Sequence, residues 1–174
     1  MAAIPPEEQF LSAYDLYADA IFRHCALRLR DRERGKDLMQ EAFMKAWEFA
    51  ASGKEIENIR AFLYSIANHL IVDTARRHKL RTEVSLEDMQ EEGFDVPSSE
   101  DTTQRTHQRF TQEQVMALLA QIEEPYRTAV VMRYIDDLSP AEIAQALEVS
   151  TNIVSVRITR GMKKLRSLLG DLHE

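Results

Sequence analysis

Apolar side chains recur every three or four residues along most of this 174-residue chain, and the pattern has one long interruption. The interruption covers residues 82–106, where Gly93 and Pro97 stand among polar residues and the apolar ones show no sustained period. Spacings of three and four predict helices on both sides of it. A structureless stretch of that length is unusual inside one domain and indicates a linker. The sequence therefore predicts an all-α fold of two small helical domains, over residues 7–81 and 107–172, joined by a flexible acidic linker.

Three helices are expected in the first domain, over residues 7–30, 35–51 and 58–78. Each combines an apolar stripe with a polar face, so the three can pack as a compact bundle. In the second domain an amphipathic segment begins near residue 107, and a further helix starts at Pro125. No internal repeat is evident.

The charge of the chain is unevenly distributed. Its net charge is −7, but residues 82–104 carry eight carboxylates and no Lys or Arg, so the other 151 residues sum to +1. Binding to nucleic acid responds to local charge, so the acidic total does not exclude it. The acidic stretch has two readings, a solvated tether or a segment that mimics nucleic acid and follows a basic channel in a partner.

The last third of the chain carries the start signals of a short helix. Ser139 can cap it, Pro140 suits the first helical position, and Glu142 can complete a capping box. A turn at residues 148–149 follows, and Ser150 can cap a longer helix. A short helix, a tight turn and a longer second helix form a helix-turn-helix.

The longer helix has an apolar seam and a basic face. From Thr151 to Gly170 there are five basic residues and no acidic one, which beside a helix-turn-helix favours groove binding. Ser150 leaves backbone N–H groups free to face a phosphate, and Arg160 can reach guanine with two hydrogen bonds. The short polar residues that would let the backbone approach base edges are Thr151, Asn152, Ser155 and Thr159. The cations suited to phosphate contact or helix support are Arg157, Lys163 and Lys164.

A second basic cluster lies between Ile59 and Arg81. Its cations include Arg60, Arg76, Arg77 and Lys79, and the residues interleaved with them are Phe62, Tyr64, Asn68 and His69. Aromatic rings beside cations suit single strands, because unstacked bases offer a π face while cations follow the phosphates. The alternative for Phe62 and Tyr64 is an ordinary place in the core or at its rim. Asp73, the one acid of the stretch, would fix an arginine or accept from a base amine.

Three segments resemble bacterial sigma factors. Residues 37–47, DLMQEAFMKAW, closely resemble the family's "DLxQExFxxxW" helix, and residues 60–67 with the basic residues after them resemble its promoter-melting helix. Residues 126–134 and 142–160 look like the family's reader of the upstream promoter element. The match covers nearly all the chain outside the linker, and the two-domain format resembles the extracytoplasmic-function (ECF) group.

The resemblance implies a function in promoter-specific transcription initiation. The second helix would dock on the clamp helices of core RNA polymerase, and the chain would also meet the polymerase flap. The residues implied for polymerase binding are Asp37, Gln40, Glu41, Lys45 and Trp47. Those implied for capture of the minus-10 element are Arg60, Phe62, Tyr64, Asn68, His69, Asp73, Arg76, Arg77 and Lys79. Those implied for the minus-35 element are Arg133, Ser150, Thr151, Asn152, Ser155, Arg157, Thr159, Arg160, Lys163 and Lys164.

The resemblance also implies further partners. The linker would thread toward the active-site and RNA-exit path, and an inhibitory anti-sigma factor would restrain the free protein. Some residues depart from the family pattern. His69 replaces the usual Asn, which predicts an altered minus-10 preference, and Asn152-Ile153 replaces Gly-Thr, which predicts an atypical upstream element. Glu148 replaces the turn glycine, at a cost of up to about 1–2 kcal/mol if its backbone is left-handed.

Three other classes of protein fit less well. An enzyme is not expected, because the chain lacks a glycine-rich phosphate loop, a Cys/His cluster at metal spacing and a nucleophile–base signature. No cofactor, metal or small-molecule substrate is expected either. A helix-turn-helix regulator acting without core polymerase would leave residues 37–47 unexplained. A protein-binding helical adaptor would leave the basic face of residues 151–169 unexplained.

The expected location is the cytoplasm. Cys25 is the one cysteine and lies on an apolar stripe, so no internal disulfide can form and an inert core thiol is expected. No apolar run approaches the length of a membrane span, and the first residues lack the pattern of a signal peptide. The protein would be nucleoid-associated in holoenzyme, or held near the membrane by an anti-sigma factor without inserting.

Overall fold

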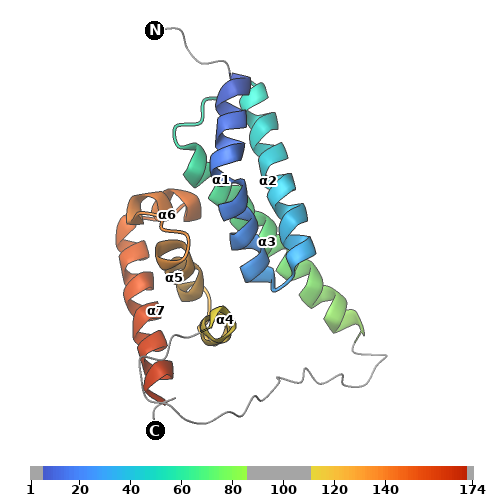
Figure 1. Cartoon of the computed structure of the whole chain (residues 1–174). Coiled ribbons are helices and arrows are strands. Elements are labelled where there is room, and N and C mark those ends of the chain that lie inside the picture. Colours follow the sequence, from blue (N-terminus) through green and yellow to red (C-terminus); the bar gives the residue numbers. More distant parts are fainter. Residues whose placement is uncertain (1–5, 86–110, 172–174) are drawn as a thin grey trace.

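A computed structural model describes residues 6–85 and 111–171, and within these ranges it contains α-helices and no β-strand (Figure 1). The helices are α1 (Pro6–Leu29), α2 (Arg32–Ala51), α3 (Ile59–Ser85), α4 (Gln112–Ala120), α5 (Tyr126–Tyr134), α6 (Pro140–Leu147) and α7 (Thr151–Asp171). The predicted all-α fold with two helical parts is confirmed. Most of the predicted linker, the predicted helical residues 107–110 and residue 172 lie outside the described ranges.

Helices α1, α2 and α3 form the N-terminal lobe. Helix α2 begins earlier than the expected residue 35, because the Asp31 side chain caps it by accepting a hydrogen bond from the Arg34 N–H at 3.1 Å. Gly35 is buried where α2 crosses α1, and a Cβ there would lie 2.6 Å from Ala26 Cα. The close approach of these two helices therefore depends on a missing side chain.

Helix α3 is longer than the sequence pattern predicts. It starts where Asn58 Oδ1 accepts from the Ala61 N–H at 3.0 Å, and it ends at Ser85, not near His78. The extra turns contain Lys, Leu and Arg, which are good helix formers that need no buried stripe. The first residues assigned to the linker, 82–85, are therefore helical, and Figure 1 shows this end of α3 projecting beyond α1 and α2.

Helices α4 to α7 form the C-terminal lobe, and α6 and α7 make the predicted helix-turn-helix. Ser139 Oγ accepts from the Glu142 N–H at 3.2 Å, and Glu142 Oε2 accepts from the Ser139 N–H at 2.9 Å. This capping box, with Pro140 at the start of α6, confirms the predicted signals. Gly161 lets α7 approach α5, because a Cβ there would lie 2.5 Å from Val130 Cγ2.

The two lobes share one hydrophobic core. Helix α6 packs along α3, and Figure 1 shows the C-terminal lobe beside the bundle, with α7 and α2 on opposite sides. Buried residues of the N-terminal lobe in this core include Ile21, Cys25, Leu63, Tyr64 and Ala67. Those of the C-terminal lobe include Met132, Leu138, Ile143 and Val154. A smaller cluster within the C-terminal lobe contains Leu119, Ile122, Val130 and Val131.

The turn between α6 and α7 carries backbone strain at Glu148. Its φ is 55° and its ψ is 42°, the left-handed conformation that favours glycine.

We expect Glu148→Gly to raise the free energy of unfolding by about 0.5–1 kcal/mol, because the exposed side chain makes only a 3.9 Å contact with His69. Urea unfolding followed by circular dichroism measures this. The control Gln145→Gly, on the exposed face inside α6, should lower stability by about 1 kcal/mol, and equal losses in the two variants would contradict the prediction.

Candidate nucleic-acid interface

The outer face of α7 collects most of the residues predicted to contact upstream DNA. Val154 and Gly161 are buried on the inner side, which leaves the opposite side of the helix to solvent. The predicted residues that are exposed are Ser150, Thr151, Asn152, Ser155, Thr159, Arg160 and Lys163, whereas Arg157 and Lys164 are half-buried. Ser150 Oγ accepts from the Ile153 N–H at 3.3 Å, and the first turn of α7 contains no acidic residue. The basic face is therefore open and its helix start suits an anion.

Three of the predicted cations already have protein partners. Lys164 pairs with Glu123, and its Nζ lies 5.2 Å from the centre of the Tyr126 ring. Arg160 Nη1 lies 3.3 Å from the Tyr126 hydroxyl, an exposed contact. Arg133 Nη1 donates to the Leu138 carbonyl at 3.3 Å, so it braces the loop that leads into α6. Of the three residues, Arg160 is exposed, whereas Lys164 and Arg133 are half-buried.

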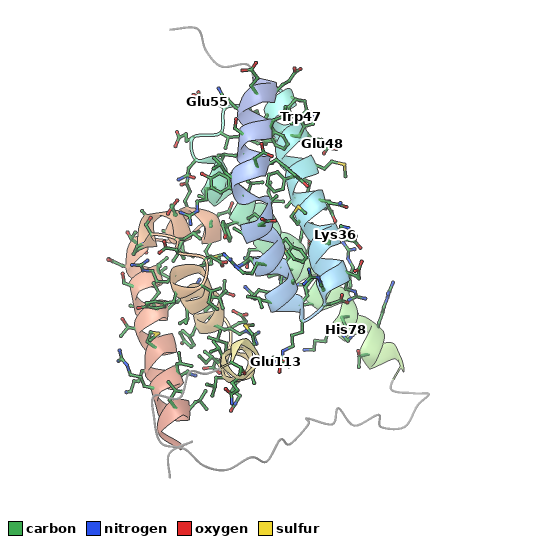
Figure 2. All side chains as sticks on the ribbon, in the orientation of Figure 1. Lys36, Trp47, Glu48, Glu55, His78 and Glu113 are labelled. Atoms are coloured by element: carbon green, nitrogen blue, oxygen red, sulfur yellow. The ribbon has the colours of Figure 1, made fainter. Side chains whose placement is uncertain are left out.

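The polar face of α2 is exposed on the side of the molecule away from α7. Asp37, Gln40, Glu41 and Lys45 line one shallow depression, together with Met44 and Glu48. Figure 2 labels Lys36 and Glu48 along this helix. Met44 is 59% exposed, and the sequence analysis missed it because a methionine at helical spacing normally belongs to a core. Trp47 is half-buried, with its ring 5.2 Å from that of Phe10, so it fastens α2 to α1.

The predicted minus-10 residues divide between the two ends of α3. Asp73, Arg76, Arg77 and Lys79 are exposed on its projecting half. Arg77 shares a cleft with Arg34, His78 and Arg81, and the acidic Asp37 of α2 also lines it. Asn68 is half-buried, and Phe62 is half-buried against Phe49, at 4.8 Å between ring centres. The projecting half of α3 is therefore a second open basic surface.

Tyr64 does not offer its ring to a base in this arrangement. Tyr64 is fully buried in the shared core, as the alternative to base stacking predicts. With the lobes packed together, the prediction that its ring stacks on a base is therefore wrong. Its ring lies 5.1 Å from that of His24. Burial, and then the negative Asp136, raise the pKa of the Tyr64 hydroxyl. Sequence spacing alone could not distinguish a buried aromatic from an exposed one.

Arg60 and His69 face the C-terminal lobe. Arg60 Nη2 donates to the backbone carbonyls of Asp136 at 2.8 Å and Asp137 at 3.2 Å, and its Nη1 lies 3.4 Å from Glu142 Oε1. His69 Nε2 lies 3.9 Å from a Glu148 carboxylate oxygen, with both side chains exposed. Arg60 is thus held between the lobes, with its guanidinium engaged by the C-terminal lobe while they are packed together.

A buried pair that the sequence analysis did not find joins the lobes beside Arg60. His24 Nδ1 lies 2.7 Å from Asp136 Oδ2, and both side chains are completely buried. The two residues are 112 positions apart, so no local pattern relates them. Burial, and then the nearby Asp136, raise the pKa of the Cys25 thiol to about 12, which fits the expected inert core thiol.

A second bridge between the lobes joins Arg28 and Glu124 at 3.0 Å. Burial alone would raise the pKa of Glu124, but Arg28 and a hydrogen bond from Thr128 outweigh it and hold the pKa below its usual value.

Within the described ranges, no cluster of His, Cys, Asp and Glu is arranged to hold a metal ion. No helix among those residues is both long and apolar enough to cross a bilayer.

An exposed basic helix-turn-helix, beside a helical bundle with a second basic surface, is typical of a DNA-binding protein. Residues 13–81 match the family "Sigma-70 region 2", and residues 112–165 match "Sigma-70, region 4". The ECF RNA polymerase sigma factor SigW of Bacillus subtilis is 30% identical over 174 aligned residues, covering 95% of this chain and 91% of SigW. The ECF sigma factor SigL of Mycobacterium tuberculosis is 28% identical, covering 91% of this chain and 88% of SigL. The chain belongs to the ECF family of RNA polymerase sigma factors.

Solved structures show the same fold. The sigma factor RpoE of Bartonella quintana, solved with the anti-sigma factor NepR, superimposes with a TM-score of 0.72 at 18% identity, over 94% of this chain and 98% of that one. CnrH, solved with the cytosolic domain of CnrY, gives a TM-score of 0.66 at 19% identity, over 95% of this chain and 90% of CnrH. The protein is a promoter-directing sigma factor, and a regulator acting without polymerase is not favoured.

Proposed function

We propose that α2 binds core RNA polymerase, the projecting half of α3 engages the minus-10 element, and α7 reads the minus-35 element. The observation that carries this division is that three different helices expose these residues, and the α2 and α3 surfaces adjoin at Asp37, which lines both. Helices α2 and α7 lie on opposite sides of the molecule (Figure 1), so the polymerase and upstream DNA need not compete. The protein acts by binding and not by catalysis, in the cytoplasm where polymerase and promoter meet.

Use of Arg60 in this function requires the lobes to separate. Its guanidinium is held by two backbone carbonyls and Glu142 of the C-terminal lobe. The α7 face needs no such change, because most of its residues, Arg160 among them, are exposed while the lobes are packed. Recognition of the upstream duplex is therefore compatible with packed lobes, whereas minus-10 capture by Arg60 belongs to an open state.

An anti-sigma factor is a further proposed partner. The solved relatives RpoE and CnrH are described in complexes with NepR and with the cytosolic domain of CnrY. Such a partner would act on this chain by holding the lobes packed, since the packed state keeps Arg60 engaged.

The polymerase surface is tested by a double variant, Asp37→Arg with Gln40→Ala. We expect the affinity for core polymerase to fall about tenfold or more, because a cation replaces the exposed carboxylate of Asp37 on the proposed docking face. Binding by fluorescence anisotropy and run-off transcription on a cognate promoter measure this. Asp19→Arg makes the same charge change on the exposed surface of α1 and should bind normally. Equal losses of polymerase binding in both variants would contradict the assignment.

The minus-35 surface is tested by Arg160→Ala. Loss of a bidentate guanine contact should weaken binding of holoenzyme to its cognate upstream element about tenfold. Arg166→Ala removes the same charge from an exposed position further along α7 and should cost about twofold or less. The cognate sequence comes from selection of random DNA by reconstituted holoenzyme. If Arg160→Ala and Arg166→Ala weakened holoenzyme binding equally on every DNA sequence, Arg160 would contact phosphate and would not read a base.

A further inference from the structure

Two aliphatic side chains lie in the middle of the polar face of α7. Ile153 is 44% exposed and Val156 is 48% exposed, and neither belongs to the shared core or to the smaller core of the C-terminal lobe. A single exposed aliphatic residue is ordinary on a protein surface. These two differ because they occupy the first two turns of a helix whose other outward residues are polar or basic.

Helical spacing places Val156 among the proposed base readers. It follows Asn152 by four residues and precedes Arg160 by four, so the three form one row along the helix. Val154 and Gly161, both buried, mark the opposite side and turn this row outward. Ile153 is three residues before Val156 and lies on the neighbouring row. Any duplex that accepts Asn152 and Arg160 in its groove must also meet Val156.

The chemistry of the major groove offers one apolar partner for such side chains. The edges of the base pairs present hydrogen-bond donors and acceptors, and the C5-methyl group of thymine is the apolar exception. A β-branched side chain on a helix is held in few rotamers, so it loses little freedom when it packs against that methyl. Opposite a phosphate or a guanine edge, the same side chain would remove water and return no hydrogen bond.

We propose that Val156, with Ile153 beside it, reads thymine methyl groups in the upstream promoter element. The inference rests on the proposed function of α7 and assigns it a base preference. The thymine lies next to the base pair that Arg160 contacts, because the two side chains are consecutive in one row. The small size and basic surroundings of the patch favour DNA over a protein partner as its occupant.

The test uses full-length protein in holoenzyme and the duplex selected from random DNA. Each thymidine of the upstream element is replaced in turn by deoxyuridine, which keeps the base pairing and lacks only the methyl. Wild-type holoenzyme should lose about three- to fivefold in affinity at one or two positions. Val156→Ala should bind the original duplex more weakly by a similar factor and no longer distinguish thymidine from deoxyuridine there. Ser167→Ala, at an exposed position of α7 to which no DNA contact is assigned, should keep the distinction.

Other outcomes overturn the inference in different ways. If wild-type holoenzyme binds every deoxyuridine duplex as tightly as the original, or if Val156→Ala still distinguishes them, Val156 reads no methyl. If Val156→Ala weakens assembly with core polymerase and leaves DNA affinity unchanged, the patch docks protein. The proposed function of α7 itself would be wrong if wild-type holoenzyme bound scrambled DNA as tightly as the selected duplex. It would also be wrong if Arg160→Ala left the affinity for that duplex unchanged.

Discussion

Gly35→Ala is expected to lower the free energy of unfolding by about 2–3 kcal/mol, although alanine is the better helix former. Helix propensity alone predicts that this substitution in a helix interior raises the free energy of unfolding by about 1 kcal/mol. A Cβ at Gly35, however, would lie 2.6 Å from Ala26 Cα and 2.7 Å from Ala26 N. These are backbone atoms of α1, so the clash can be relieved only by moving two helices apart along one of the most extensive contacts of the fold.

The matched control for Gly35 is Gly170→Ala. Gly170 also lies in a helix, but a Cβ there would have no neighbour within 4 Å. That variant should be neutral or gain up to about 0.5 kcal/mol, since the end of a helix frays. Urea unfolding of both variants, followed by circular dichroism, gives the two free energies. Should Gly35→Ala stabilise the protein as Gly170→Ala does, α1 and α2 do not approach as closely as described.

Features set by neighbours in sequence were predictable. The capping box at Ser139 and Glu142 involves residues three apart, and the apolar seam of α7 repeats within a few turns. The exposed basic face followed from the same repeat, because the side opposite a buried seam must meet water. The left-handed backbone at Glu148 was considered only as a condition, because the family resemblance places a glycine at that turn, and the structure supplies the conformation itself.

Features that join distant residues were not predictable. Arg60 meets Glu142 across 82 positions, and His24 meets Asp136 across 112. Composition and periodicity describe one helix at a time, so they gave Tyr64 two possible roles and could not choose between them. The end of α3 was misplaced for a related reason: its last turns lie beyond the bundle and have no apolar stripe to mark them.

Asp136→Ala is expected to have the second large effect on stability, because it breaks the buried pair between the lobes. The carboxylate lies 2.7 Å from His24 Nδ1, and the imidazole that remains would have no partner in the core. A buried polar group without a hydrogen bond costs about 1–3 kcal/mol, and we expect a loss of about 2–3 kcal/mol in the free energy of unfolding. Asp137→Asn removes the neighbouring charge from a side chain 93% exposed and should cost less than about 0.5 kcal/mol.

A second substitution distinguishes loss of the pair from loss of any buried side chain. Adding His24→Leu to Asp136→Ala removes the unpartnered imidazole, so the double variant should be more stable than Asp136→Ala alone. Simple additivity predicts the opposite, because each residue removed from a core normally adds its own cost. Urea unfolding of the two single variants and the double variant completes the cycle, and strictly additive losses would show that the pair does not act as a unit.

The same variant connects stability to function, because the loop that carries Asp136 also holds Arg60. The Asp136 and Asp137 carbonyls both accept from the Arg60 guanidinium, so loosening this joint should free that side chain. Phenylglyoxal modification of Arg60, followed by mass spectrometry, should therefore be severalfold faster in Asp136→Ala than in Asp137→Asn, while the exposed Arg76 reacts equally in both. Equal rates at Arg60 in the two variants would mean that the buried pair does not control access to the minus-10 surface, and that separation of the lobes depends on the apolar contact of α3 with α6.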